Sequence, residues 1–136
     1  MRKYFFLEEP VAKGRPRLTT IGGHARAFTP EKTRTYEYIL RGLAQHQNTE
    51  NKWQPLAGAL KVKVKFFLTK PKSAKKRNYP IVKPDLDNFL KSSLDAFNDI
   101  IWIDDSQICV IEAAKEYSTN AGFIVLEVEQ IENEQR

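Results

Sequence analysis

The feature that most constrains the fold is the stretch Leu60-Lys61-Val62-Lys63-Val64-Lys65-Phe66-Phe67-Leu68, in which apolar residues and lysines alternate from Leu60 to Phe66. Successive side chains of a β-strand point to opposite faces, so this pattern predicts a strand with one apolar face and one row of lysines. The apolar face must be covered by another layer of the protein. The chain is therefore expected to contain a sheet with one buried side.

Further strands are expected on both sides of this stretch. A first strand is predicted over residues 3–8, and residues 17–20 and 24–28 flank Ile21-Gly22-Gly23 in the manner of a small hairpin. Near the carboxyl end, residues 107–117 and 123–128 are predicted to pair as a second hairpin around the turn at 118–122.

Two helices are expected. Thr29-Pro30-Glu31 is a typical helix start, and apolar residues at helical spacing predict a helix from about Pro30 to about His46. Asp87 is predicted as the N-cap of a second helix that runs to about Asn98. A polar linker is expected over residues 48–54.

These elements predict an α+β fold in a single two-layer domain over residues 1–136. A mixed or antiparallel sheet of about four to six strands would carry two main helices. Residues from about 129 to 136 are mostly polar and acidic, and are expected to fray.

Composition narrows the environment and the partner. The net charge is +5, which favours an anionic partner. A single cysteine, Cys109, excludes a disulfide scaffold within one chain; we expect a buried thiol and a cytoplasmic protein. No segment approaches the roughly 18 apolar residues of a membrane span, so no membrane association is expected.

Acidic residues gather around the start of the second helix. Asp85 and Asp87 are two residues apart, Lys91 follows one helical turn later, and Asp104-Asp105 comes after a short connection. Carboxylates without nearby histidine or cysteine suit Mg²⁺ or Mn²⁺. The alternative is a helix cap beside a solvated loop residue. Asp95 is expected to hold Lys91 in place rather than to bind metal, and Asp104 to support the site or shape the turn.

Basic residues precede this acidic cluster. Between Lys61 and Pro84 there are nine basic residues and no acidic ones. Such a stretch suits phosphate binding beside a metal site, although the lysine row of the strand could equally be a solvated face. A second basic segment, residues 13–17, precedes the first hairpin. It is either a phosphate-binding finger or a solvated turn. The candidate DNA-binding residues are Lys13, Arg15, Arg17, Lys70, Lys72, Lys75, Lys76, Arg77 and Lys83.

Taken together, the motifs resemble the RusA-type Holliday junction resolvases over most of the chain. The resemblance rests on Lys83-Pro84-Asp85-Leu86-Asp87-Asn88, Lys91, Asp95-Ala96 and Trp102-Ile103-Asp104-Asp105-Ser106-Gln107. Lys13-Gly14-Arg15-Pro16-Arg17 and Phe28-Thr29-Pro30 resemble the branch of this family found in phages and prophages of Gram-positive bacteria.

The resemblance implies a small α+β homodimer that binds four-way DNA junctions and makes paired nicks with Mg²⁺. It assigns the essential acidic residues to Asp85, Asp87 and Asp105, as metal ligands, and the essential lysine to Lys91. The basic stretch before the motif is longer here than is typical of the family, so individual phosphate contacts are not carried over.

Three functions compete at this point. The first is the junction resolvase. The second is a general Mg²⁺-dependent nuclease for flaps or branched DNA, and the third is a non-catalytic basic module that binds DNA. Binding and cleavage of a junction, a flap and a duplex, each with and without Mg²⁺, would distinguish the three.

Overall fold

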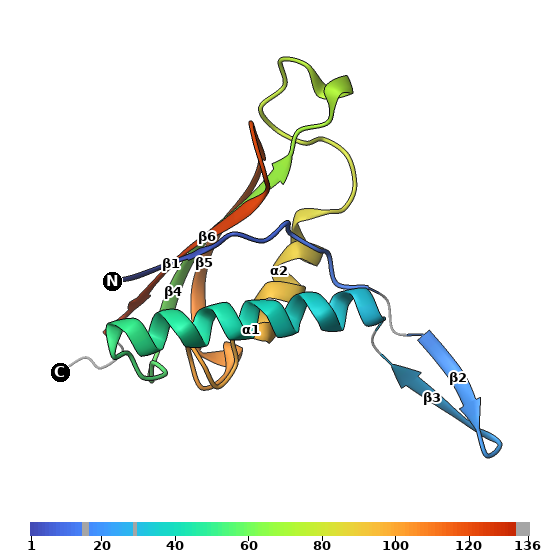
Figure 1. The fold of residues 1–136 in the computed structure, drawn as a ribbon. Helices are drawn as coiled ribbons and strands as arrows, with labels where there is room; N and C mark the ends of the chain where they lie inside the picture. The colour runs from blue at the N-terminus through green and yellow to red at the C-terminus, as the bar shows by residue number, and fades with distance from the viewer. Residues whose placement is uncertain (15–16, 29, 133–136) are drawn as a thin grey trace.

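The alternating stretch forms β4 (Leu60–Thr69), which lies inside a four-stranded sheet of order β1-β6-β4-β5. The computed structural model describes residues 1–14, 17–28 and 30–132 (Figure 1). β6 (Phe123–Gln130) runs antiparallel to β4, β5 (Ile108–Ser118) runs parallel to it, and β1 (Arg2–Phe6) pairs antiparallel with β6. The predicted mixed sheet and α+β class are confirmed.

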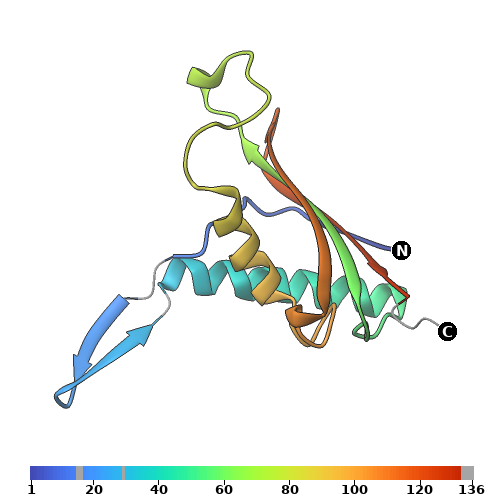
Figure 2. The same cartoon turned by 180° about the vertical axis from the view of Figure 1, so that it is seen from behind.

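Both main helices, α1 (Glu31–Asn51) and α2 (Leu86–Ala96), cover one face of the sheet (Figures 1 and 2). Alternate residues of β1, β4 and β6 point into this layer and are fully buried. Phe66 of β4 stacks on Phe89 of α2 at 5.6 Å, and Phe6 of β1 stacks on Phe97 at 5.0 Å. These ring contacts fix α2 on the sheet. Neither described helix combines the length and the apolar character that a membrane crossing requires.

The first helix extends further than the sequence indicates. It ends at Asn51 rather than near His46, so part of the predicted polar linker is helical. Asn48 explains the difference, because its buried side chain accepts a hydrogen bond from the Tyr4 hydroxyl at 2.7 Å and donates one to the Ile100 carbonyl at 2.8 Å. These contacts tie the last turns of α1 to β1 and to the segment after α2.

The predicted hairpin between the last two strands is wrong. β5 and β6 do not pair with each other, because β4 lies between them. Thr69 of β4 is opposite Ser118, and Phe67 of β4 is opposite Phe123. The parallel β4–β5 pair requires a crossover connection, which α2 supplies.

Two expectations for the carboxyl-terminal part of the chain differ from the structure, in which β5 is an edge strand. Cys109 was expected to be buried but is exposed on this edge, next to the exposed side chains of Val110 and Ile111. The residues expected to fray are in part ordered: β6 continues to Gln130, and the Ile131 N–H donates to the Ala59 carbonyl at 2.8 Å. Residues 133–136 lie outside the described part of the chain.

The predicted small hairpin is confirmed. β2 (Arg17–Ile21) and β3 (His24–Phe28) pair antiparallel, and Gly22 and Gly23 take positive φ values of 59° and 83° in the turn. Glycine adopts this backbone without a steric penalty. The hairpin projects away from the sheet and helices (Figures 1 and 2).

Candidate active site

The amino-terminal end of α2 carries the first acidic pair. Asp85 is the N-cap, with φ −70° and ψ 151°, whereas Asp87 lies in the first turn; the prediction of Asp87 as the cap is therefore wrong by two residues. The Asp85 side chain does not accept a capping hydrogen bond from the helix. Both residues are exposed. Two carboxylates thus lie at the positive end of the helix dipole, available to an external ligand.

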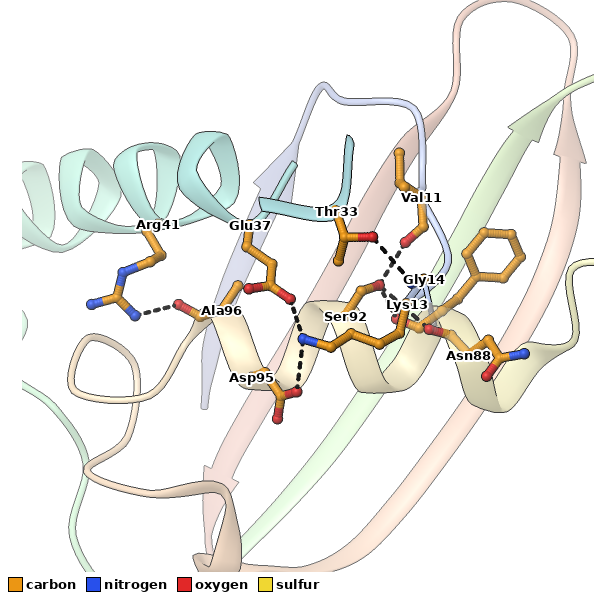
Figure 3. Close-up of polar contacts among 11 residues, drawn as sticks. Val11, Lys13, Gly14, Thr33, Glu37, Arg41, Asn88, Ser92, Asp95 and Ala96 are labelled. Carbon is orange, nitrogen blue, oxygen red and sulfur yellow. Dashed lines mark hydrogen bonds and ion pairs between the residues drawn. The ribbon is translucent and has the colours of Figure 1, made fainter. Parts of the chain in front are cut away.

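Residues 10–14 clamp α2 against α1 (Figure 3). The Lys13 N–H donates to the Asn88 carbonyl at 2.9 Å, and the Ser92 hydroxyl donates to the Val11 carbonyl at 2.5 Å. The Gly14 N–H donates to the Thr33 hydroxyl at 3.1 Å. A Cβ at Gly14 would lie 2.9 Å from Pro30, so glycine permits this close approach. The clamp holds the acidic end of α2 in a fixed position.

Lys13 belongs to this clamp. Its ammonium lies 2.7 Å from Glu37 of α1 and 3.6 Å from Asp95 of α2 (Figure 3). Partial burial alone would lower the pKa of Lys13, but hydrogen bonding and attraction from the two carboxylates outweigh it and raise the pKa. Asp95, expected to hold Lys91, instead pairs with Lys13. The charge of Lys13 is thus engaged within the chain.

Lys91 is in a different situation. It lies on α2 one turn after Asp87, on the same side of the helix. Its side chain is exposed and makes no ion pair with any residue of the described ranges. Within the described residues, Lys91 lacks the expected ion pair with Asp87 or Asp95. Lys91 therefore presents an unneutralised positive charge beside the acidic pair.

The second acidic pair has divided roles. Asp104 caps the short 3-10 helix η2 (Asp105–Gln107): its carboxylate accepts from the Ser106 N–H at 3.0 Å. Hydrogen bonding from Ser106, through its side chain first and its backbone N–H second, lowers the pKa of Asp104. Gln107 completes a capping box by accepting from the Asp104 N–H at 2.9 Å, and its amide donates to two carbonyls before β4. Asp104 is thus a turn residue, and the half-buried Asp105 keeps its carboxylate out of the cap.

Asp105 lies at the opposite end of α2 from Asp85 and Asp87. Lys115, well along β5, donates to the carbonyls of Val82 and Pro84 just before α2, whereas Asp105 precedes the start of β5. The views from both sides show α2 beginning part-way along β5 and finishing near the start of that strand (Figures 1 and 2). The expected convergence of three carboxylates does not occur within one chain.

The donor chemistry nevertheless fits a hard divalent ion. Asp85 and Asp87 supply only carboxylate oxygens, which suit Mg²⁺ or Mn²⁺, and Mg²⁺ is commonly bound by one or two carboxylates together with water and phosphate. Over residues 1–14, 17–28 and 30–132, no group of three or more His, Cys, Asp or Glu side chains is arranged to hold a metal ion. The first acidic pair therefore offers two of the oxygen ligands that such an ion takes.

The basic loop, residues 70–84, joins β4 to α2. It contains the short 3-10 helix η1 (Lys72–Ala74), and the buried side chains of Ala74 and Pro80 hold it to the body. Its candidate DNA-binding residues are all exposed apart from the half-buried Lys70: Lys72, Lys75, Lys76, Arg77 and Lys83. The loop contains no acidic residue. Its positive charge is thus open to solvent next to the acidic pair.

The lysine row of β4 is compensated by acidic residues on the neighbouring strands. Lys61 lies 3.6 Å from Glu112, and Lys65 lies 3.6 Å from Glu116, both on β5. Lys63 is in register with Glu112 on one side and with Glu127 of β6 on the other. Of the two interpretations left open for this row, the structure favours a solvated, charge-balanced face.

Two amino-terminal candidates are described only in part. Arg15 lies outside the described residues, and Arg17 is described only through the backbone of β2. Sequence reasoning missed Lys115, which secures the end of the basic loop from a distant strand and carries no local signal of that role. It also missed a cavity of about 640 Å³ between residues 9–14, the basic loop and α2. Its largely apolar lining includes Val11, Leu68, Pro71, Val82, Phe89 and Tyr117.

Comparison with known proteins finds a family match over most of the chain and a relative in a bacterium. Residues 8–129 match the protein family described as "Endodeoxyribonuclease RusA". Over 127 residues the chain is 32% identical to a protein of Bacillus subtilis (strain 168) described as "Uncharacterized protein YqaN". That alignment covers 85% of this chain and 87% of the relative.

Proposed function

The chain belongs to the RusA endodeoxyribonuclease family, whose members resolve Holliday junctions, and on this basis we propose that it makes paired symmetric nicks in four-way DNA junctions with Mg²⁺. The family match makes it a structure-specific endonuclease and fits the resemblance found in the sequence. Nucleases of this family are metal-dependent in general. The observation that carries the finer proposal is the uncompensated acidic pair at the start of α2, beside the basic loop.

We propose that Asp85 and Asp87, together with Asp105, hold the divalent ion. A bound Mg²⁺ supplies polarisation of the scissile phosphate and activation of a water molecule. The cap position of Asp85 and the clamp of residues 10–14 orient the acidic pair before DNA arrives. Preorientation of this kind reduces the free energy needed to assemble the site.

Lys91 is proposed to act on the phosphate. Its ammonium is unpaired within the described chain and lies one turn from Asp87. A cation at this place offsets the negative charge that develops on the phosphate during attack. The basic loop contributes differently, because its lysines bind the backbone of the DNA and determine affinity more than rate.

A homodimer accounts for the position of Asp105. Four-way junctions have approximate two-fold symmetry, and two related active sites can cut opposed strands. A two-fold axis that sets the two α2 helices antiparallel would bring Asp105 of one copy to the Asp85–Asp87 pair of the other. The exposed edge of β5, with Val110 and Ile111, offers apolar surface for such a contact.

Subunit complementation tests this arrangement. Asp85→Asn and Asp105→Asn proteins are each expected to be inactive alone. If each site combines residues from two copies, a mixed dimer of the two variants retains one intact site and nicks one strand. If each site lies within one chain, the mixture stays inactive, and the proposed arrangement is wrong.

Substrate class is tested with wild-type protein on a fixed four-way junction, a flap and a linear duplex, each with and without Mg²⁺. Paired cuts at symmetric positions of the junction, only with metal, are expected. Equal cutting of flaps would indicate the general nuclease. Binding without cutting would indicate the non-catalytic module.

The exposed Cys109 thiol supports a reducing compartment, and we propose the cytoplasm.

A further inference from the structure

Three apolar side chains stand out on the surface of the basic loop. Tyr79, Ile81 and Val82 are 61%, 77% and 56% exposed. Pro80, which lies among them in the sequence, is buried. We call the three exposed residues the apolar ridge. Exposed apolar residues that lie together within a polar rim, unlike single scattered ones, mark an interaction surface.

The ridge is exposed on a loop that is firmly held. The Tyr117 N–H of β5 donates to the Asn78 carbonyl at 2.8 Å, just before the ridge. After the ridge, the Lys115 ammonium donates to the carbonyls of Val82 and Pro84 at 2.9 and 3.0 Å. Pro80, between Tyr79 and Ile81, is buried. The side chains of Tyr79 and Ile81 are thus presented outward by anchored backbone, and Val82, which also lines the cavity beside residues 9–14, remains exposed next to them. An anchored backbone lowers the entropy lost when these side chains bind a partner.

The charge around the ridge identifies the class of partner. Residues 70–84 contain six basic residues and no acidic one. Two copies of such a loop would repel each other, so a second copy of this chain is disfavoured as the occupant. A polyanion that also offers flat apolar surface satisfies both the cations and the ridge. DNA has these properties wherever the faces of its bases are exposed.

The ridge lies close to the proposed site of cleavage. Val82 precedes Asp85 by three residues, which places their Cα atoms no more than about 11 Å apart even if the chain is fully extended. Successive base pairs are spaced by about 3.4 Å along a strand. The ridge therefore reaches bases within a few nucleotides of a phosphate held at Asp85.

We propose that the apolar ridge stacks against exposed nucleobases at the branch point and holds the junction open beside the cut site. This inference rests on the proposed function and adds a recognition element to it. Unstacking is less costly where base pairing or stacking is already interrupted, so a stacking ridge favours a branch point over continuous duplex. Tyr79 supplies the aromatic face, and Ile81 and Val82 the aliphatic support.

The test uses junctions with 2-aminopurine at the branch point, whose fluorescence rises when the base is unstacked, and metal-free conditions that prevent cleavage. Wild-type protein is expected to raise the fluorescence. Tyr79→Ala/Ile81→Ala should lose most of this rise and bind the junction roughly tenfold more weakly. Its affinity for linear duplex should stay within about twofold, because the cations are retained. Tyr38→Ala is the matched control, since Tyr38 is 79% exposed on α1 and far from the loop in sequence.

Three results would overturn the inference. The first is an unchanged fluorescence rise with the ridge variant. The second is an equal loss of junction and duplex binding, and the third is a change of oligomeric state in sedimentation, which would make the ridge a contact between copies. Ile81→Ser alone, with circular dichroism on each protein, provides a second variant if the double variant misfolds. Wild-type protein that cuts junctions while the ridge variant behaves normally removes only this inference; wild-type protein that does not bind junctions removes the proposed function with it.

Discussion

The two ends of α2 use charged residues in opposite ways. At the amino-terminal end, the carboxylates of Asp85 and Asp87 and the ammonium of Lys91 form no ion pairs within the described ranges. Toward the carboxyl-terminal end, Asp95 is joined to Lys13 and through it to Glu37. Charges paired within the chain hold elements together, whereas exposed unpaired charges remain available for a metal ion or DNA.

The two basic surfaces differ in the same way. The lysines of β4 face glutamates on β5 and β6, while the loop that follows β4 contains no acidic residue at all. Both surfaces belong to one continuous basic stretch of sequence. Charge counted along the chain therefore overestimates the surface that can bind DNA, because acidic residues on neighbouring strands neutralise part of it.

The largest difference is expected between the two members of the second acidic pair. Asp105→Asn should lower cleavage by roughly a thousandfold or more, since it removes a proposed ligand of the catalytic ion. Asp104→Asn should stay within about threefold, because asparagine also caps helices well. Single-turnover cleavage of a junction measures both. Equal losses in the two variants would contradict the division of roles.

A smaller effect is expected for the two lysines of the α2 region. Lys91→Ala should slow cleavage by roughly a hundredfold, as for loss of a well-placed electrostatic group. Lys91→Arg should restore only part of the rate, since a planar guanidinium does not replace a compact ammonium. Lys13→Ala should leave the chemical step nearly unchanged and lower the free energy of unfolding by about 1 kcal/mol or less.

Both lysine variants are compared by single-turnover cleavage at saturating protein, with urea unfolding as the control for stability. A Lys91→Ala rate within about threefold of wild type corresponds to less than about 0.7 kcal/mol of activation free energy. That result would place Lys91 among the solvated surface residues.

The basic loop and the lysine row of β4 are expected to contribute differently to the salt dependence of DNA affinity. Replacing Lys72, Lys75 and Lys76 by glutamine should reduce the slope of log affinity against log salt by about two to three, because fewer counterions are released from DNA. The same replacement of Lys61, Lys63 and Lys65 should change the slope by less than about one. Binding titrations with a junction at several salt concentrations measure both. Equal slopes for the two triple variants would show that the glutamates do not neutralise the β4 row.

The smallest effect is expected for the cap of η2. Hydrogen bonding from Ser106 lowers the pKa of Asp104 below its ordinary value of 3.8, so the ionised cap stabilises the folded protein above that value and the contribution is lost as the pH falls through the folded-state pKa. Asp104→Asn should therefore unfold with a weaker dependence on pH between about 5 and 2. Urea unfolding across this range measures it. An unchanged pH dependence would show that the cap is not formed in solution.

Local sequence patterns predicted the individual strands and turns better than they predicted which strands pair with each other. The alternation of 60–68 indicated β4, and Gly22-Gly23 indicated the turn of the β2–β3 hairpin, because both signals depend on backbone geometry within a few residues. The pairing of β5 and β6 could not be predicted. A strand inserted between them leaves their own apolar patterns unchanged, and only the crossover through α2 determines the order.

The candidate site was predicted as a set of residue types but not as an arrangement. The motif identified Asp85, Asp87, Lys91 and Asp105, whose roles remain predictions. It did not show that Lys13, more than 80 residues away along the chain, would take Asp95 as its partner. It also did not show that Asp105 lies at the far end of α2, since sequence proximity says little about position across a helix and a strand.

We propose that the unpaired carboxylates at the start of α2 perform the chemistry and that the paired carboxylate of Asp95 further along does not. Single-turnover cleavage of a fixed four-way junction by Asp87→Asn and Asp95→Asn, both on α2, tests it most directly. Asp87→Asn is expected to abolish cleavage while junction binding is kept or strengthened, because the amide removes a metal ligand and a repulsive charge. Asp95→Asn should cut within about threefold of wild type. Near-normal cutting by Asp87→Asn, or equal loss in both variants, would contradict the account.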